Sequence, residues 1–318
     1  MRIVIVGPGA LGSLLAARIA LFIEQKRAAG TDNDLPEVSL LDYKAERVRQ
    51  IRELGLLLEE KGQRIHCTIQ VEVTPELCAG CDVLFFCVKS IAVMGALERI
   101  APFLRPETLF VAMQNGIGHL EAITALPCMS GVGITSEGAT LIAPGHVRHG
   151  GAGMTRLGVL DAETDSSLQR LAKTMEIMNA AGLETRITHN PLRYIWAKLF
   201  INVAINALTA IYRCPNGELL HFPAARDIMD RAVREAVSIA GALEIPVEGD
   251  PAASAFRICE STASNISSML QDVQNQRQTE IDAINGAVIS LGKRLGIATP
   301  VNEDLVRQVK LIEASYQQ

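Results

Sequence analysis

The spacing of apolar residues along the chain changes in character near residue 190. Up to residue 189, short apolar runs of strand length alternate with segments of helical spacing, beginning with a run at 2–6 and a helical pattern at 11–22. Such alternation is typical of a parallel sheet covered by helices on both faces. From residue 190 to residue 318 long helical patterns continue without strand-like runs. We therefore predict a doubly wound α/β domain over residues 1–189 and an all-helical domain over residues 190–318.

Further strands of the first domain follow from their patterns. Residues 38–41, 83–88 and 109–113 are continuous apolar runs, which indicate strands buried on both faces. Residues 65–73 alternate between apolar and polar side chains, as an edge strand does. Residues 131–161 contain short runs broken by Pro-Gly and Gly-Gly pairs, which favour a small antiparallel extension of the sheet. The sequence thus predicts a sheet of six or more strands.

The composition limits the classes of partner. A chain of 318 residues, 48% of them hydrophobic, is typical of a globular protein with two domains. A formal net charge of -5 argues against nucleic acid or an anionic membrane as a partner. We see neither a signal peptide nor a membrane-spanning run, and the seven cysteines, including the pair Cys78 and Cys81, fit reduced core thiols. We expect a cytoplasmic protein without a metal, and the apolar helical domain favours a homodimer.

The strongest local signal is the glycine-rich segment Gly7-Pro8-Gly9-Ala10-Leu11-Gly12. It follows a buried strand and opens a helix, which is the context in which G-x-G-x-x-G binds a dinucleotide. The first glycine allows a tight turn, the second lets the backbone approach a pyrophosphate, and the third lets the helix pack closely. The segment therefore predicts a Rossmann-type doubly wound domain with the cofactor pyrophosphate at the helix N-terminus.

Two neighbouring features leave the choice of nicotinamide cofactor open. Asp42 ends the second strand, where an acidic side chain accepts hydrogen bonds from the ribose 2'-hydroxyl and favours NADH. Lys44 and Arg47 follow closely and can instead pair with the 2'-phosphate of NADPH. The polar segment 27–37 lengthens the connection into this strand, and we interpret it as a surface insertion without an assigned role.

Polar residues also follow two of the central strands. Lys89 and the pair Asn115-Gly116 each come just after a buried run, at the strand ends where ligands bind in open parallel sheets. We take Lys89 and Asn115 as candidate ligand contacts. On placement alone, a surface lysine and a turn asparagine are equally good interpretations.

The segment 194–212 is apolar nearly all round, and Lys198 is its only formally charged residue. Such a helix should be buried. Lys198, Asn202 and Asn206 follow one another at i, i+4 spacing, and Thr209 lies close to the same line, so their polar groups form one stripe. A cationic donor beside two amides suits a negatively charged carbonyl substrate. A structural stripe satisfied by another helix is the alternative.

A ketone reductase needs a group that stabilises negative charge on the substrate oxygen and then delivers a proton. Lys198 can do both. Burial lowers the pKa of a lysine toward neutrality and so makes the ammonium group a better acid. The neighbouring amides can orient a substrate without titrating.

The chain resembles the ketopantoate reductase (2-dehydropantoate 2-reductase) family over nearly its whole length. The resemblance rests on the glycine segment, Asn115-Gly116, and the segments 196–199, 202–209, 214–218, 265–272 and 279–282. It implies reduction of 2-dehydropantoate to (R)-pantoate with NADPH, in the pathway to pantothenate and coenzyme A. The family often carries Arg just after the second strand, where this chain has Asp42-Tyr43-Lys44.

The resemblance also implies a role for particular residues. Lys198 is the expected proton donor. The expected substrate contacts are Asn115, Asn202, Asn206, Asn216 and Ser268, and the expected cofactor contacts besides the glycine segment and Asp42 are Lys89, Asn115 and Glu280. Ser268 and Glu280 would lie about 18 Å apart along an unbroken helix, too far to line one small site. Because Thr279 and Asp282 have the spacing of a helix cap, we predict a bend near Gln278.

Three alternatives stay open at this point. A related reductase of another branched 2-oxo acid would share every feature above. A dehydrogenase that oxidises a hydroxy acid would share the architecture and work in the opposite direction. A non-catalytic nucleotide sensor would keep the glycine segment but would not need the lysine and asparagine stripe.

Overall fold

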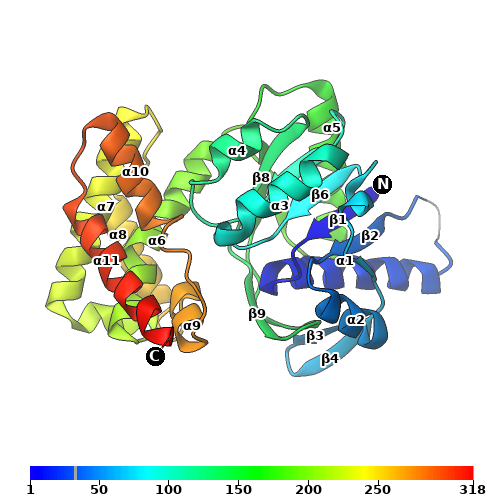
Figure 1. Cartoon of the computed structure of the whole chain (residues 1–318), viewed down its shortest axis with the longest axis horizontal. Helices are drawn as coiled ribbons and strands as arrows, with labels where there is room; N and C mark the ends of the chain where they lie inside the picture. The colour runs from blue at the N-terminus through cyan, green and yellow to red at the C-terminus, as the bar shows by residue number, and fades with distance from the viewer. Residues whose placement is uncertain (32–33, 318) are drawn as a thin grey trace. The chain divides into compact units, whose positions relative to one another are not determined.

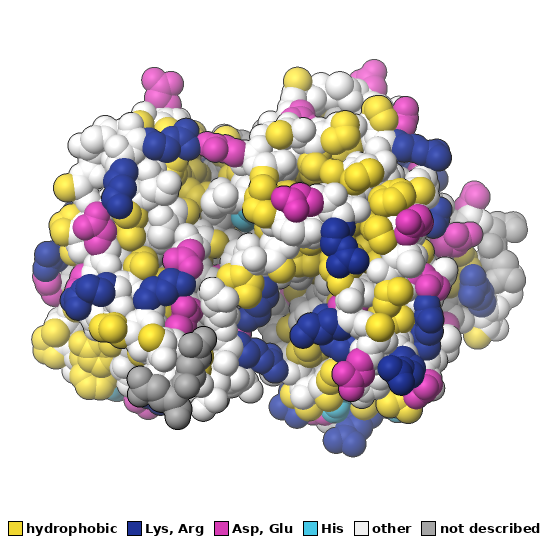
Figure 2. Space-filling view, viewed as in Figure 1, with side chains coloured by type: hydrophobic (Ala, Val, Ile, Leu, Met, Phe, Trp, Pro, Cys, Tyr) yellow, Lys and Arg dark blue, Asp and Glu magenta, His cyan; other side chains and the backbone are white. Residues whose placement is uncertain are grey.

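The computed structural model describes residues 1–31 and 34–317 and divides the chain into two compact units (Figure 1). The first unit contains Met1–Gln114 and Glu121–Pro191, and the second contains Asn115–Leu120 and the residues from Leu192 onward. The short segment Asn115–Leu120 thus belongs to the helical unit, although its neighbours on both sides in the chain belong to the sheet unit. Figure 2 shows acidic and basic side chains interspersed on the visible face of each unit.

An eight-stranded sheet forms the centre of the first unit, in the order β12-β11-β8-β7-β6-β1-β2-β5. Its strands are β1 (Arg2–Val6), β2 (Glu37–Leu41), β5 (Gln70–Glu72), β6 (Val83–Phe86), β7 (Leu109–Ala112), β8 (Met129–Thr135), β11 (Thr155–Val159) and β12 (Thr185–Ile187). Neighbouring strands are parallel except β8 and β11. The prediction of six or more strands is confirmed, and the continuous apolar runs are the central strands.

A second, four-stranded sheet has the order β4-β3-β10-β9. It contains β3 (Leu56–Glu60), β4 (Gln63–Cys67), β9 (Gly138–Ala143) and β10 (His146–Gly151). One prediction is wrong here and another is confirmed in part. The alternating run 65–73 is two strands, β4 in this sheet and β5 at the edge of the main sheet. Of the antiparallel extension predicted over 131–161, β8 and β11 do pair antiparallel in the main sheet, whereas the β9–β10 hairpin belongs to the small sheet. An alternating pattern marks a half-buried strand, but it does not say which sheet the strand joins.

Helix α1 (Ala10–Ala28) packs into a core that contains residues of both sheets. The sequence predicted one apolar face, whereas residues 12–17 are all buried. Leu14 shares this core with Ile5 of the main sheet and with Val147 of the small sheet. The helix is therefore covered on more than one side. The other helices of the unit are α2 (Ala45–Leu54), α3 (Val93–Ile100), α4 (Leu120–Thr124) and α5 (Asp165–Ala180).

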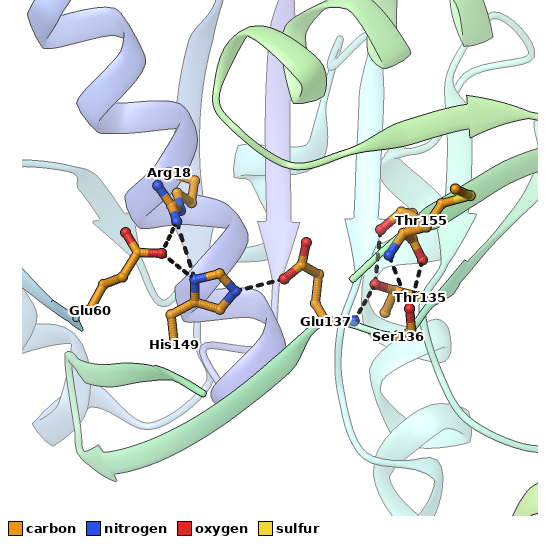
Figure 3. Close-up of polar contacts among 8 residues, drawn as sticks. Arg18, Glu60, Thr135, Ser136, Glu137, His149 and Thr155 are labelled. Carbon is orange, nitrogen blue, oxygen red and sulfur yellow. Dashed lines mark hydrogen bonds and ion pairs between the residues drawn. The ribbon is translucent and has the colours of Figure 1, made fainter. Parts of the chain in front are cut away.

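A cluster of charged side chains joins α1 to the small sheet (Figure 3). His149 Nδ1 lies 2.5 Å from Glu60 Oε1, and its Nε2 lies 2.7 Å from Glu137 Oε2. Arg18 of α1 also pairs with Glu60. The His149 and Glu137 side chains are only 4% and 2% exposed. His149 Nδ1 also lies 3.2 Å from Arg18 Nη2, so Arg18, Glu60, His149 and Glu137 form one connected polar cluster.

The second unit consists of helices around α6 (Pro191–Tyr212). They are α7 (Pro223–Ala242), α8 (Pro251–Ser261), α9 (Ser268–Gln274), α10 (Asn285–Leu295) and α11 (Pro300–Ala314). Helix α6 is long and apolar enough to cross a membrane by length and composition, yet 67% of its most apolar window is buried, as in a core helix. Val203, Ala204 and Ala207 are fully buried in the core of the unit. The prediction of a buried apolar helix is confirmed.

The predicted break before Glu280 is present, because α9 ends at Gln274 and α10 begins only at Asn285. The predicted helix cap at Thr279 is wrong. The Thr279 hydroxyl donates to Glu313 Oε1 at 2.6 Å and accepts a hydrogen bond from Ile281 N at 3.2 Å. The residues that follow form turns instead of a helix. Glu313 of α11 therefore fixes the Thr279 side chain, an interaction that depends on a residue 34 positions away.

Candidate active site

The glycine segment of the first unit has the geometry that a dinucleotide needs. Gly7 has φ +93°, and a Cβ there would lie 2.9 Å from Val88 N, so no other residue fits without strain. A Cβ on Gly12 would lie 2.1 Å from Gly7 O, which shows how closely α1 packs on the turn. Gly9 precedes α1 and has no side chain to cap it, so the first-turn N–H groups are left for an anion. These residues fit a pyrophosphate.

Asp42 is engaged by Arg47. Arg47 Nε donates to Asp42 Oδ2 and Arg47 Nη2 donates to Asp42 Oδ1, each at 2.5 Å. Lys44 N adds a further hydrogen bond to Asp42 Oδ1 at 3.2 Å. The Asp42 side chain is 4% exposed, and that of Arg47 is 31% exposed. Both carboxylate oxygens, which the sequence assigned to a ribose hydroxyl, therefore already accept hydrogen bonds from within the protein.

The first unit also contains the candidate Lys89 and the cysteine pair Cys78 and Cys81. Lys89 is exposed and stands directly before a short 3₁₀ helix, Ser90–Ala92, that follows β6. Cys78 and Cys81 are buried free thiols, and burial raises their pKa values to about 12 and about 11. Thiols of this kind are unreactive. Among residues 1–31 and 34–317, no group of three or more His, Cys, Asp or Glu side chains is arranged to hold a metal ion.

The polar stripe of the second unit lies on α6. Asn206 is 6% exposed and Thr209 is fully buried, while Lys198 and Asn202 are partly buried. The Thr209 hydroxyl bonds back to the carbonyl groups of Ile205 and Asn206, at 3.0 and 2.9 Å. The stripe thus runs from a partly open end at Lys198 to a closed end at Thr209.

Lys198 is electrostatically the most unusual residue of the stripe. Burial of its ammonium group lowers the pKa of Lys198 from 10.5 to about 8, although the carboxylate of Glu280 acts in the opposite direction. The shift costs the charged form about 3 kcal/mol relative to a lysine in water. A lysine that titrates near pH 8 is still mostly charged at pH 7 and gives up its proton easily.

Asn115 and Glu280 meet in the same unit. Asn115 Nδ2 donates to Glu280 Oε2 at 3.2 Å. The neighbouring Gly116 has φ +81°, and a Cβ there would lie 2.0 Å from Ala283 O. The segment at Asn115 is therefore packed tightly on the loop that carries Glu280, and Glu280 in turn acts on Lys198. Three of the residues chosen from the sequence, Lys198, Asn115 and Glu280, come together.

Asn216 is bonded to the segment that joins α8 to α9, and Ser268 directly follows that segment. Asn216 is buried, and its Nδ2 donates to Thr262 Oγ1 at 2.9 Å. Ser268 is exposed and is the first residue of α9, whereas the preceding Ser267 is buried and caps the helix by accepting from Leu270 N. Ser267 was not singled out in the sequence, because two adjacent serines look alike until one of them is placed at the helix cap.

A sheet domain with a dinucleotide turn, followed by a helical unit that holds a desolvated lysine among amides, is the construction of a nicotinamide-dependent oxidoreductase. The particular family follows from comparison with known proteins. Residues 3–162 match the family described as Ketopantoate reductase PanE/ApbA, and residues 190–313 match Ketopantoate reductase PanE/ApbA C terminal. The chain belongs to the ketopantoate reductase family.

Individual relatives are similar to this chain over its whole length. The chain is 32% identical to the 2-dehydropantoate 2-reductase of Halobacterium salinarum, over 98% of this chain and 99% of that protein. A ketopantoate reductase of the same family from Ralstonia eutropha JMP134 has a structure with a TM-score of 0.87 and 28% identity, covering 100% of both chains. The structure of D-mandelate dehydrogenase with NADH and anilino(oxo)acetate has a TM-score of 0.85 and 27% identity, also over 100% of both chains.

Proposed function

We propose that this protein reduces ketopantoate to (R)-pantoate with NADPH, and that Lys198 is the proton donor. The observation that carries the proposal is the lysine in the α6 stripe, whose pKa is lowered to about 8 by burial. Membership of the ketopantoate reductase family gives the reaction type. A nucleotide sensor would have no use for a charged lysine that costs the fold free energy.

The reaction needs one hydride and one proton. Gly7, Gly9 and Gly12 would hold the pyrophosphate of a reduced nicotinamide cofactor, which would supply the hydride for the carbonyl carbon of the substrate. Lys198 donates a hydrogen bond to the carbonyl oxygen as negative charge develops there, and then transfers its proton to that oxygen. Glu280 favours the charged form of Lys198 before the reaction. The neutral lysine is recharged from solvent.

We assign the remaining residues by the same reasoning. Asn202 and Asn206 lie on the Lys198 line of α6, so their amides can orient the 2-oxo acid. Asn115, Asn216 and Ser268 are proposed as further substrate contacts. Lys89, Asn115 and Glu280 are proposed to contact the cofactor, together with the glycine turn. We further infer that the protein is a cytoplasmic homodimer that acts on a small-molecule substrate and has neither nucleic acid nor a membrane as partner. Light scattering of the purified protein tests whether it is a dimer.

The cofactor preference depends on the pair Asp42 and Arg47. With both Asp42 oxygens already accepting from Arg47, the carboxylate is a poor acceptor for a ribose diol, and the guanidinium remains 31% exposed beside it. A partly exposed guanidinium is suited to a 2'-phosphate. We therefore favour NADPH over the NADH that Asp42 alone predicts.

Two variants and a control test this choice. Arg47→Ala should raise KM for NADPH and lower KM for NADH, because it removes the phosphate partner and frees Asp42. Asp42→Asn should improve NADPH relative to NADH. Arg49→Ala changes an exposed arginine of the same helix and should change neither ratio. If Arg47→Ala leaves the ratio of the two kcat/KM values unchanged, Arg47 does not select the cofactor.

A second candidate function is the reduction of a different 2-oxo acid with NADH. It is favoured by the structural similarity to D-mandelate dehydrogenase, whose structure contains NADH and anilino(oxo)acetate. Steady-state kinetics with ketopantoate and a panel of branched and aromatic 2-oxo acids, each with both nicotinamides, separate the two. The proposal predicts the highest kcat/KM for ketopantoate with NADPH. A higher value for another 2-oxo acid favours the second candidate, and cofactor binding without turnover favours a sensor.

A further inference from the structure

In the segment between α8 and α9, residues 262–267, the first four residues are held in place by Asn216 and Gly217. Asn216 N donates to Asn265 O at 3.0 Å, and Gly217 N donates to Ala263 O at 3.1 Å. A Cβ on Gly217 would lie 2.5 Å from the Ala263 Cβ, so the two backbones approach as closely as a glycine allows. This end of the segment therefore has little freedom to move.

The last residue of the segment, Ser267, is joined to α6 by a side-chain hydrogen bond. Thr209 Oγ1 and Ser267 Oγ lie 2.6 Å apart. Thr209 is fully buried and Ser267 is 8% exposed, so water competes little for either hydroxyl. The two residues are 58 positions apart in the chain.

The direction of this hydrogen bond follows from the other partners. Each hydroxyl has one proton. Thr209 uses its proton on the carbonyl of Ile205 or Asn206, and Ser267 Oγ already accepts from Leu270 N at 3.0 Å. Ser267 is therefore the donor and Thr209 the acceptor. The resulting chain of hydrogen bonds runs from the N-terminus of α9 through Ser267 and Thr209 to the backbone of α6.

The two ends of this chain adjoin two proposed substrate contacts. On α6 it reaches the backbone beside Asn206, and on α9 it fixes the residue directly before Ser268. We propose that Thr209 and Ser267 are positioning residues that hold Ser268 in register with Asn206, and that they thereby set the affinity for the 2-oxo acid without touching it. This inference rests on the proposed role of Ser268 as a substrate contact.

Four variants measure this arrangement: Thr209→Val, Thr209→Ser, Ser268→Ala and the double variant Thr209→Val with Ser268→Ala. Thr209→Val keeps the shape of the side chain and removes the acceptor. It should raise KM for ketopantoate about tenfold, the equivalent of one hydrogen bond, and change kcat and KM for NADPH by less than about twofold. Thr209→Ser should restore the wild-type KM for ketopantoate. In the Ser268→Ala background, Thr209→Val should add less than about twofold, because both changes remove the same interaction.

A variant of Ser267 keeps the test valid if Thr209→Val does not fold. Ser267→Gly removes the donor hydroxyl at a helix cap where glycine costs only a few tenths of a kcal/mol. It should raise KM for ketopantoate by the same factor. The melting temperature of each variant is measured in parallel.

Several results would overturn the inference. If Thr209→Val raises KM for ketopantoate equally in the wild type and in the Ser268→Ala variant, the hydrogen bond between Thr209 and Ser267 does not act through Ser268. A parallel loss of kcat, both KM values and melting temperature shows that it only stabilises the fold. If Ser268→Ala alone leaves KM for ketopantoate unchanged, the assigned contact is wrong, and that failure is visible in the single variant. Turnover of ketopantoate by the wild type tests the proposed function separately.

Discussion

The pH dependence of turnover gives the most quantitative test of the role of Lys198. With a pKa of about 8, about nine-tenths of the Lys198 side chains are protonated at pH 7 and about one-tenth at pH 9. If the reaction requires the protonated lysine, kcat/KM for ketopantoate should fall roughly tenfold between these pH values. A lysine with the ordinary pKa of 10.5 would lose less than about one-twentieth of its protons over the same interval.

The assay is the oxidation of NADPH at 340 nm as a function of pH from about 6 to 10, with ketopantoate well below KM so that the rate reports the free enzyme. Lys198→Arg is the matched variant, because a guanidinium keeps the charge but does not lose its proton in this range. It should be slow, and its profile should lack the descending limb near pH 8. A wild-type profile that stays flat to pH 9.5, or a Lys198→Arg profile with the same descending limb, would refute the assignment.

Glu280→Gln removes the carboxylate that raises the pKa of Lys198, so the descending limb of the pH profile should move to lower pH, and an unchanged limb would contradict the coupling. Lys198→Met should be more stable than the wild type at pH 7 by up to about 3 kcal/mol in urea unfolding, because the lowered pKa of Lys198 means that its charged form disfavours the folded state below pH 8. This difference in stability should shrink as the pH rises toward 10.5. A variant that is less stable than the wild type would argue against desolvation of Lys198. Gly12→Ala should abolish cofactor binding in fluorescence titrations, because the new Cβ would lie 2.1 Å from a backbone oxygen, and normal affinity would show that the turn can widen. His149→Gln should destabilise the first unit by about 1–3 kcal/mol, since it removes the ring that lies 2.7 Å from the buried Glu137 carboxylate, while Glu60 keeps its pairing with Arg18. His189→Gln, at a side chain that is 73% exposed, should change stability by less than about 0.5 kcal/mol, and equal effects of the two changes would contradict this.

Those parts of the fold that depend on local pattern could be predicted from the sequence. The strand at Arg2–Val6 and the glycine turn that follows it are adjacent in the chain, and the turn needs glycine for reasons of backbone geometry alone. The buried α6 helix and its polar stripe follow from helical periodicity, because residues at i, i+4 spacing share a face whatever surrounds the helix. The lowered pKa of Lys198 then follows from burial.

The parts that depend on distant partners could not be predicted. The alternating run 65–73 gave no indication that its two halves, β4 and β5, join different sheets. Thr279 has the spacing of a helix cap, but its hydroxyl donates to Glu313 while it accepts from Ile281 N, and the sequence does not show that α11 brings a carboxylate to this position. Arg47 forms an ion pair with Asp42, which is only five positions away in the chain, yet the sequence does not indicate that Asp42 binds Arg47 in preference to a ribose hydroxyl. Residues 27–37, interpreted as an insertion, include positions 32 and 33, which lie outside the described residues.

The central claim is that Lys198 donates the proton in the reduction of ketopantoate. Its most direct test compares kcat for the wild type and Lys198→Ala at pH 7, with saturating ketopantoate and NADPH, and measures NADPH binding to both proteins by fluorescence. We predict that kcat falls by about 10²- to 10⁴-fold in the variant while NADPH affinity stays within about twofold. Wild-type turnover by Lys198→Ala, or an equal loss of NADPH affinity and of kcat, would contradict the claim.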